Sequence, residues 1–326
     1  MLKAASVGLG WWSDELAESV QGKSQAIRIV TCTSRSADKR RAFAAKFGTD
    51  QHEDYEAVLE DPDIEAVLLT TPNSLHGAHV RQAAAAGKHV FVEKPYTLAA
   101  ADARSATAAC RDSGVVLAVG HNRRFAPATE SLKAMIEAGE FGTLLHIEAE
   151  FAKDTALGLP PGHWRANRAE SPAGAMTGLG IHMVDAICFL FGPIARVTAI
   201  SKQRAVCVPM DDTTCALFEF ESGATGYLGT LFASPLTSFL NVYGSKTAAY
   251  AGDDFTTLSV RTADAGPAPK PLAAIDTVRA ELEEFAATCA GGDAFRVRPE
   301  EATHNVAVME AIVASAAEGS RSVTVA

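Results

Sequence analysis

Short apolar runs and longer amphipathic segments alternate along the first 120 residues. The apolar runs are four to eight residues long, and the run 27–33 is rich in β-branched residues, as expected for strands buried on both faces. Glycine or proline ends most of the segments and thereby indicates their boundaries. The alternation predicts a doubly wound parallel sheet covered by helices on both faces. The expected strands are 2–8, 27–33, 66–71, 89–93 and 115–120, and the expected helices are 14–21, 37–47, 55–59, 74–86 and 99–113.

The pattern changes near Arg124. One more helix, 129–139, precedes longer runs in which apolar and polar residues alternate, which is typical of an antiparallel sheet with one covered face. We therefore expect an α/β chain with two domains, 1–124 and 125–326, the second built on an open, mostly antiparallel sheet. The expected strands of that sheet are 144–151, 194–201, 213–220, 224–231 and 238–243, followed by a loop at 265–271 and helices 274–290 and 300–318.

An open sheet with an uncovered apolar face needs a partner. The sequence therefore predicts a homodimer, or a homotetramer built as a dimer of dimers, assembled through the C-terminal sheet. The net charge of −10 argues against a nucleic-acid partner, because phosphate binding needs a basic surface. No apolar run approaches the ~20 residues of a membrane span, and the segment before the first glycine is too short for a signal peptide.

The six cysteines have no CxxC spacing and are expected to be reduced thiols of a cytoplasmic protein. Histidine and carboxylate residues form no cluster at ligand spacing, so no metal site is expected. A small-molecule substrate is the remaining class of partner.

The first chemical motif is Gly8-Leu9-Gly10, which follows the first strand and precedes the first helix. The first glycine permits a tight turn, and the second permits close approach of a pyrophosphate to the backbone. The helix N-terminus adds N–H donors and a positive dipole. The position of the usual third glycine holds the small Ser13. Backbone N–H groups of Trp11 and Trp12 are expected to reach the pyrophosphate, whereas their rings are expected to pack against the second domain.

The end of the second strand indicates which dinucleotide is bound. An NAD site usually carries Asp or Glu there, on the ribose hydroxyls. This chain carries Ser34 and Arg35 instead, with Lys39 and Arg40 one turn later. Because an arginine pairs with a 2′-phosphate, NADP(H) is the preferred cofactor and NAD(H) the alternative. The structural alternative is that Arg35 is only a solvated loop residue.

The fifth strand ends in Glu93-Lys94-Pro95. Ligands of doubly wound sheets bind at the carboxyl ends of the strands, so Lys94 is expected near the nicotinamide. A lysine desolvated beside that cationic ring has a lowered pKa and can exchange a proton with a substrate hydroxyl.

These motifs resemble the Gfo/Idh/MocA family, named for glucose–fructose oxidoreductase and inositol dehydrogenase. The resemblance extends from the first strand to the C-terminal segment. It implies a Rossmann domain, a second α/β domain, and hydride transfer between NAD(P) and sugars, polyols or related cyclic alcohols. Lys94 corresponds to the family's general acid/base, and His182 to the histidine that contacts the reacting hydroxyl. The segments that carry the resemblance are Gly8-x-Gly10, Thr71-Pro72-Asn73 with His76, 86–90, Glu93-Lys94-Pro95, Gly174-Ala175 and 180–185.

Several of these positions are assigned to the cofactor. The expected cofactor-binding residues are Gly8, Gly10, Trp11, Trp12, Ser13, Ser34, Arg35, Thr71, Pro72, Asn73, His76, Glu93, Lys94 and Asn122. Asn122 follows the sixth strand at the same sheet end as Lys94, where it would bind the carboxamide or the substrate.

One position departs from the family pattern. Many sugar dehydrogenases of the family carry an aspartate four residues before the histidine, and this chain has Gly178 there. Without that carboxylate, proton transfer is left to Lys94 and His182. The departure leaves a sugar or polyol in question and admits a less polar ring, such as a cyclic dihydrodiol, or carbonyl reduction.

The remaining substrate candidates are charged or aromatic. Arg124 is expected either to pair with an anionic substrate group or to form an interdomain salt bridge. Trp164 and Arg165 lie in a Pro/Gly-bounded loop before the histidine helix, where Trp164 would line a pocket and Arg165 would bind cofactor or substrate. Asp185 is expected either to orient His182 or to be structural.

Two other function classes stay open at this point. The fold also suits an NAD(P)-binding sensor or regulatory protein without net redox activity, which the glycine at 178 would allow. A further alternative is elimination or hydrolysis in which the hydride returns within one turnover.

Overall fold

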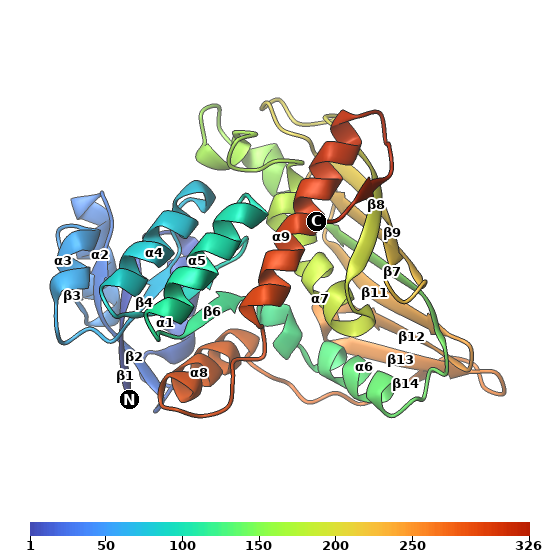
Figure 1. Ribbon diagram of the computed structural model, residues 1–326, viewed down its shortest axis with the longest axis horizontal. Coiled ribbons are helices and arrows are strands. Elements are labelled where there is room, and N and C mark those ends of the chain that lie inside the picture. The colour runs from blue at the N-terminus through green and yellow to red at the C-terminus, as the bar shows by residue number, and fades with distance from the viewer. The chain divides into compact units, whose positions relative to one another are not determined.

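The structure, a computed structural model, describes all 326 residues and consists of two compact units (Figure 1). The first unit comprises Met1–Asn122 and Asp276–Thr303. The second comprises Arg123–Ile275 and His304–Ala326. The chain therefore returns to its first unit late in the sequence, which differs from the single boundary after residue 124 that the sequence suggested.

Six parallel strands form the sheet of the first unit, in the order β3-β2-β1-β4-β5-β6. This order confirms the expected doubly wound sheet. The short strand β3 was not expected, because its two residues are polar and exposed. The strands are β1 (Leu2–Val7), β2 (Ile27–Thr33), β3 (Asp50–Gln51), β4 (Ala66–Leu69), β5 (His89–Glu93) and β6 (Leu117–Gly120).

The helices of the first unit include one from the late segment. Helix α8 packs against α1 and β2, and α4 and α5 form a second adjacent pair (Figure 1). Leu282 and Phe285 of α8 are buried, and the Phe285 ring lies 5.8 Å from the ring of Phe91 in β5. This apolar packing explains why 276–303 groups with the first unit. The helices are α1 (Trp11–Val20), α2 (Ala37–Phe47), α3 (Tyr55–Glu60), α4 (His76–Ala85), α5 (Ala100–Asp112) and α8 (Thr277–Cys289).

The second unit contains a nine-stranded sheet in the order β14-β13-β12-β11-β7-β10-β9-β8-β15. Only β7 and β10 pair in parallel, so the expected mostly antiparallel sheet is confirmed. The strands β12, β13, β14 and β15 were not predicted. The first of them is rich in alanine, a weak strand former, and β14, within the expected loop 265–271, and β15 have two residues each. The strands are β7 (Leu144–Ala152), β8 (Ile194–Lys202), β9 (Thr213–Phe220), β10 (Thr225–Leu231), β11 (Thr237–Gly244), β12 (Thr247–Gly252), β13 (Thr257–Thr262), β14 (Ala268–Pro269) and β15 (Val323–Thr324).

One face of this sheet forms the core of the second unit. Ile147, Leu228 and Leu240 of neighbouring strands are fully buried in the cluster that also contains the apolar side of α7. On the opposite face, Ile200 and Leu217 are 48% and 59% exposed. This face of the sheet thus carries exposed apolar residues. The helices of the second unit are α6 (Pro127–Glu137), α7 (Ile181–Phe191) and, from His304 onward, α9 (Pro299–Ala317). No helix of the chain is both long and apolar enough to cross a bilayer.

Candidate functional site

The glycine turn after β1 depends on its first glycine for two reasons. Gly8 has φ +88°, a conformation that residues with a side chain rarely adopt. A Cβ added there would also stand 2.8 Å from Cγ2 of Thr71 and 2.9 Å from its backbone nitrogen. At Gly10 a Cβ would meet no atom within 4 Å, so the backbone there faces open space. Both observations fit a turn that accepts a pyrophosphate against its backbone.

Ser13 closes the turn on itself. Its buried Oγ donates to the carbonyl of Gly10 at 2.6 Å and accepts from the Gly10 N–H at 2.9 Å. Trp11 and Trp12 are the first residues of α1, with ring centroids 5.0 Å apart in an edge-to-face arrangement. Backbone N–H groups of a first helical turn have no partner within the helix, which makes this turn a suitable anion site.

A basic group surrounds the end of β2. Arg35 is exposed, Arg40 donates from Nη1 to the carbonyl of Ser34 at 2.6 Å, and Lys39 donates from Nζ to the carbonyl of Leu9 at 3.1 Å. The Lys39 contact places this basic group next to the glycine turn, where the adenosine end of a dinucleotide is expected.

His76 connects the turns after β4 and β5. The ring is buried, with Nδ1 2.8 Å from the carbonyl oxygen of Pro95 and Nε2 2.9 Å from that of Thr71. Both ring nitrogens therefore lie at carbonyl oxygens of the protein, which gives His76 a positioning role. Pro72 and Asn73 lie in the turn that it holds, and Asn73 begins a short 3₁₀ helix, Asn73–Leu75.

Glu93 and Lys94 occupy the end of β5. The Glu93 carboxylate is buried, accepts from the Lys94 N–H at 3.2 Å, and has Oε1 so close to Gly120 that a Cβ there would stand 2.8 Å away. Burial raises the pKa of Glu93 to about 7, although Lys94 and Trp12 oppose the rise. The glycine turn after β1 and the end of β5 thus meet at Glu93. Lys94 itself is only partly buried.

Asn122 lies at the end of the first unit. Its Nδ2 donates to Oγ1 of Thr277, at the start of α8, over 3.4 Å. The turns after β1, β4, β5 and β6 thus belong to the carboxyl ends of neighbouring parallel strands, where α/β sheets bind their ligands.

His182 belongs to the second unit and is the second residue of α7. It is 8% exposed, and its ring centroid lies 6.3 Å from that of Phe151. A π-helical turn, Met176–Gly180, leads directly into α7. Such turns are frequent at functional sites, because the additional residue redirects the side chains that follow. Lys94 and His182 belong to different units, and the structure describes each of them with its own neighbours.

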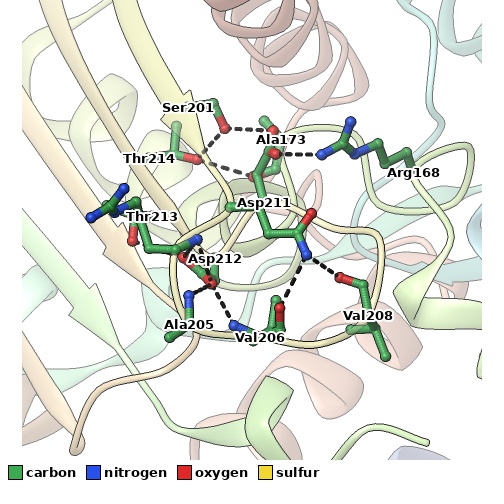
Figure 2. Close-up of polar contacts among 12 residues, drawn as sticks. Arg168, Ala173, Ser201, Ala205, Val206, Val208, Asp211, Asp212, Thr213 and Thr214 are labelled. Carbon is green, nitrogen blue, oxygen red and sulfur yellow. Dashed lines mark hydrogen bonds and ion pairs between the residues drawn. The ribbon is translucent and has the colours of Figure 1, made fainter. Parts of the chain in front are cut away.

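The π-turn is anchored by the 203–212 loop, which joins β8 to β9 (Figure 2). The carbonyl oxygen of Asp211 accepts from the Ala175 N–H at 3.4 Å and would collide with any Cβ on Gly174. Its carboxylate accepts from Oγ of Ser201 and from Arg168, both at 2.9 Å. The residues before the π-turn are therefore fixed to β8 through one aspartate.

The neighbouring Asp212 organises the loop itself (Figure 2). Its buried carboxylate accepts three backbone N–H bonds, from Arg204, Ala205 and Val206, and a hydroxyl bond from Thr213. Burial alone would raise the pKa of Asp212, but these hydrogen bonds outweigh it and hold the pKa below its ordinary value.

Arg124 is not available to a substrate, which corrects the expectation from the sequence. Its guanidinium is 1% exposed and forms a bidentate pair with the fully buried Asp185, with the closest contact at 2.7 Å. Asn305 of α9 donates a further bond to the same carboxylate at 2.8 Å. The pair lies within the second unit, so it is neither a substrate contact nor an interdomain bridge. It joins the segment before α6 to α7 and α9, which gives Asp185 a structural role.

Trp164 and Arg165 lie together in a short helical turn, Trp164–Ala166. The Arg165 guanidinium stacks 4.6 Å from the Trp164 ring, and burial lowers the pKa of Arg165. A partly buried cation on an aromatic face is suited to an anionic or polyhydroxylated ligand.

Two features of this region were missed from the sequence. Phe232, just after β10, packs its ring against Gly178, and the 203–212 loop holds the π-turn. Neither has a motif, because both depend on segments brought together only by the fold.

Comparison with known proteins gives family matches to both parts of the chain. A family model described as "Oxidoreductase family, NAD-binding Rossmann fold" matches residues 2–121. A second, described as "GFO/IDH/MocA C-terminal domain", matches residues 129–250.

Individual relatives agree with these matches. The chain is 31% identical to scyllo-inositol 2-dehydrogenase (NAD(+)) of Bacillus subtilis, over 72% of this chain and 68% of that protein. It is 29% identical to D-xylose 1-dehydrogenase (NADP(+)) 2 of Haloferax volcanii, over 88% and 89%. A crystal structure of an oxidoreductase from Desulfitobacterium hafniense matches with a TM-score of 0.94 and 33% identity, covering 99% of this chain and 97% of that one.

Proposed function

The chain belongs to the Gfo/Idh/MocA oxidoreductase family, and from that premise we propose that Lys94 and His182 carry out the proton transfers of its reaction. The protein is an NAD(P)-dependent oxidoreductase that interconverts a hydroxyl and a carbonyl on a small cyclic substrate. The observation that carries the residue assignment is the position of Lys94, immediately after β5 and at the same sheet edge as the end of β1, whose glycine turn fits a pyrophosphate.

The residues divide the chemistry between them. Held by the glycine turn after β1 and by Arg35, a bound NAD(P) would supply hydride acceptance in oxidation and hydride donation in reduction. During oxidation, Nζ of Lys94 takes the proton of the substrate hydroxyl, and during reduction it returns that proton to the carbonyl oxygen. The His182 imidazole donates a hydrogen bond to the same oxygen and so holds it in place. Trp164 and Arg165 supply binding contacts to the rest of the ligand.

We propose NADP(H) as the preferred cofactor, with NAD(H) as the alternative. The support is Arg35, which is exposed beside Lys39 and Arg40 at the end of β2, where it can pair with a 2′-phosphate. The relatives include one named for NAD and one named for NADP, so the preference rests on these residues.

We further propose that the protein is a cytoplasmic homodimer or homotetramer. The cytoplasm is supported by its six free cysteines. Assembly is supported by the outer face of the nine-stranded sheet, where Ile200 and Leu217 are exposed and Tyr227 pairs with Leu217 across neighbouring strands.

The test is a screen of cyclic alcohols and ketones, followed by the nicotinamide absorbance and by mass spectrometry of the product. One carbonyl formed for each NADPH is the expected balance. Substrate conversion without any net change in nicotinamide would instead indicate an internal hydride return, and bound nucleotide that never changes redox state would indicate a sensor. No relative named above supports a sensor.

A further inference from the structure

An aromatic side chain covers the backbone one turn before His182. Gly178 is the only residue of the π-turn Met176–Gly180 that is partly exposed. A Cβ at Gly178 would stand 2.6 Å from Cζ of Phe232 and 3.3 Å from its Cε2. Real Cβ atoms essentially never approach a ring so closely, so the Phe232 ring occupies the space that any side chain at 178 would need.

The backbone of Phe232 is fixed on both sides. Its N–H donates to the carbonyl of Asp212 at 2.8 Å, and its carbonyl accepts from the Ala156 N–H at 3.0 Å. The preceding residue Asp211 accepts from the N–H of Ala175, just before the π-turn. Asp211 and Asp212 of the 203–212 loop therefore fix the backbone on both sides of the contact between Phe232 and Gly178.

Aromatic rings lie beside His182 and beside the turn that precedes it. Phe151 has its ring centroid 6.3 Å from the imidazole, and Phe232 covers Gly178, four residues before His182. An aromatic ring face offers no strong hydrogen-bond partner to a hydroxyl. A substrate hydroxyl pressed against it loses its water without replacement, which costs about 1–3 kcal/mol, or roughly 5- to 150-fold in affinity. Burial of an unsubstituted C–H face of the substrate ring carries no such cost and is favourable.

We propose that Phe232 is a specificity-determining residue that selects ring alcohols with an unsubstituted C–H face beside the reacting hydroxyl. The favoured class is deoxy or partly unsaturated cyclic diols, and the disfavoured class is fully hydroxylated rings such as inositols. This inference rests on the proposed function, because it places the reacting hydroxyl at His182.

The experiment compares two six-membered rings that share a vicinal diol and differ only in their other hydroxyls, 1,2-cyclohexanediol and myo-inositol. With NADP⁺, we expect the wild-type kcat/KM to be at least about 10-fold higher for cyclohexanediol. Phe232→Ser admits water beside Gly178 and should lower this ratio at least about 10-fold. The apolar Phe232→Leu should keep the ratio within about 3-fold of wild type. Phe47→Ser is the matched control, because Phe47 is also a partly buried ring but lies at the end of α2, in the first unit.

Calorimetric titration of the NADPH complex with both diols gives a second readout that needs no turnover, and circular dichroism checks that each variant is folded. A ratio unchanged in Phe232→Ser, or a wild-type preference for inositol, overturns the inference and leaves the proposed function intact. Reduction of neither nucleotide by either ring overturns the inference, and absence of turnover across the whole screen of cyclic alcohols and ketones overturns the proposed function as well.

Discussion

The buried carboxyl of Glu93, next to the proposed acid/base Lys94, gives the fold a dependence on pH. Burial raises the pKa of Glu93 from 4.5 to about 7, so the folded chain binds this proton more tightly than the unfolded chain. The stability that the protonated carboxyl contributes is therefore complete below the pKa of Glu93 in the unfolded chain. It is lost as pH rises through the pKa of Glu93 in the folded chain.

Glu93→Gln is expected to flatten the pH profile of stability between about pH 4.5 and 7, because the amide stays neutral throughout. The unfolding free energy of wild type should fall by at most a few kcal/mol over that range, at ~1.4 kcal/mol for each pKa unit. Urea unfolding at several pH values measures the difference. Glu60→Gln, at an exposed position, is the control. An equal pH dependence of the unfolding free energy in wild type and in Glu93→Gln would contradict the account.

Arg35 determines the cofactor preference in this account. A hydrogen bond to a charged group is worth ~1.5–3 kcal/mol, so Arg35→Ala should weaken NADPH binding about 10- to 100-fold. Binding of NADH should change by less than about 2-fold, since NADH lacks the 2′-phosphate. Fluorescence titration with both nucleotides measures the effect, with the exposed Arg28 on the same strand giving the control Arg28→Ala. Equal losses for both nucleotides, or tighter wild-type binding of NADH, would reject the assignment.

At the scale of elements, the buried pair Arg124–Asp185 joins helices that are distant in sequence. Asp185→Ala leaves a buried guanidinium without its carboxylate and should cost about 3–5 kcal/mol of unfolding free energy. The double variant Arg124→Met with Asp185→Leu should recover most of that loss, because no buried charge remains. Urea unfolding measures both, and a loss below about 1 kcal/mol in Asp185→Ala would show that the pair is not structural.

Much of the element pattern was predictable from local sequence. The alternation of strands and helices in the first 120 residues predicted the parallel sheet. The alternation of apolar and polar residues between Leu144 and Tyr243 predicted the antiparallel one. The glycine turn and the strand end at Lys94 were also identified, because motifs within a βαβ unit have fixed spacing. Assignment of Arg124 to the substrate was wrong, since an arginine in a sequence does not show whether a buried carboxylate meets it.

Other features depend on tertiary contacts alone. The return of α8 to the first unit follows from Phe285 meeting Phe91, which lies 194 positions earlier in the chain (285 − 91). The contact of Phe232 with Gly178 likewise joins separate segments. A single sequence carries no signal for such pairs, because periodicity reports which face of an element is buried and not what covers it.

At the scale of the whole molecule, the outer face of the nine-stranded sheet is expected to form the subunit interface. Leu217→Lys places a charge on that face and should shift the protein toward monomer, as measured by light scattering across a dilution series. Leu145→Lys is the matched control, because Leu145 is also an exposed leucine, 51% against 59%, but lies two residues before the buried Ile147 of β7 and so on the other side of the sheet. A monomeric wild type, or an unchanged mass in Leu217→Lys, would rule out this interface.

The most direct test of the central claim is the turnover of Lys94→Ala on a cyclic alcohol that the wild type oxidises, with nucleotide affinity measured on the same preparations. Loss of a positioned acid/base should lower kcat about 10²- to 10⁴-fold. NADPH affinity should change little, because the glycine turn and the Arg35 region remain intact. Turnover close to that of wild type in Lys94→Ala would contradict the account.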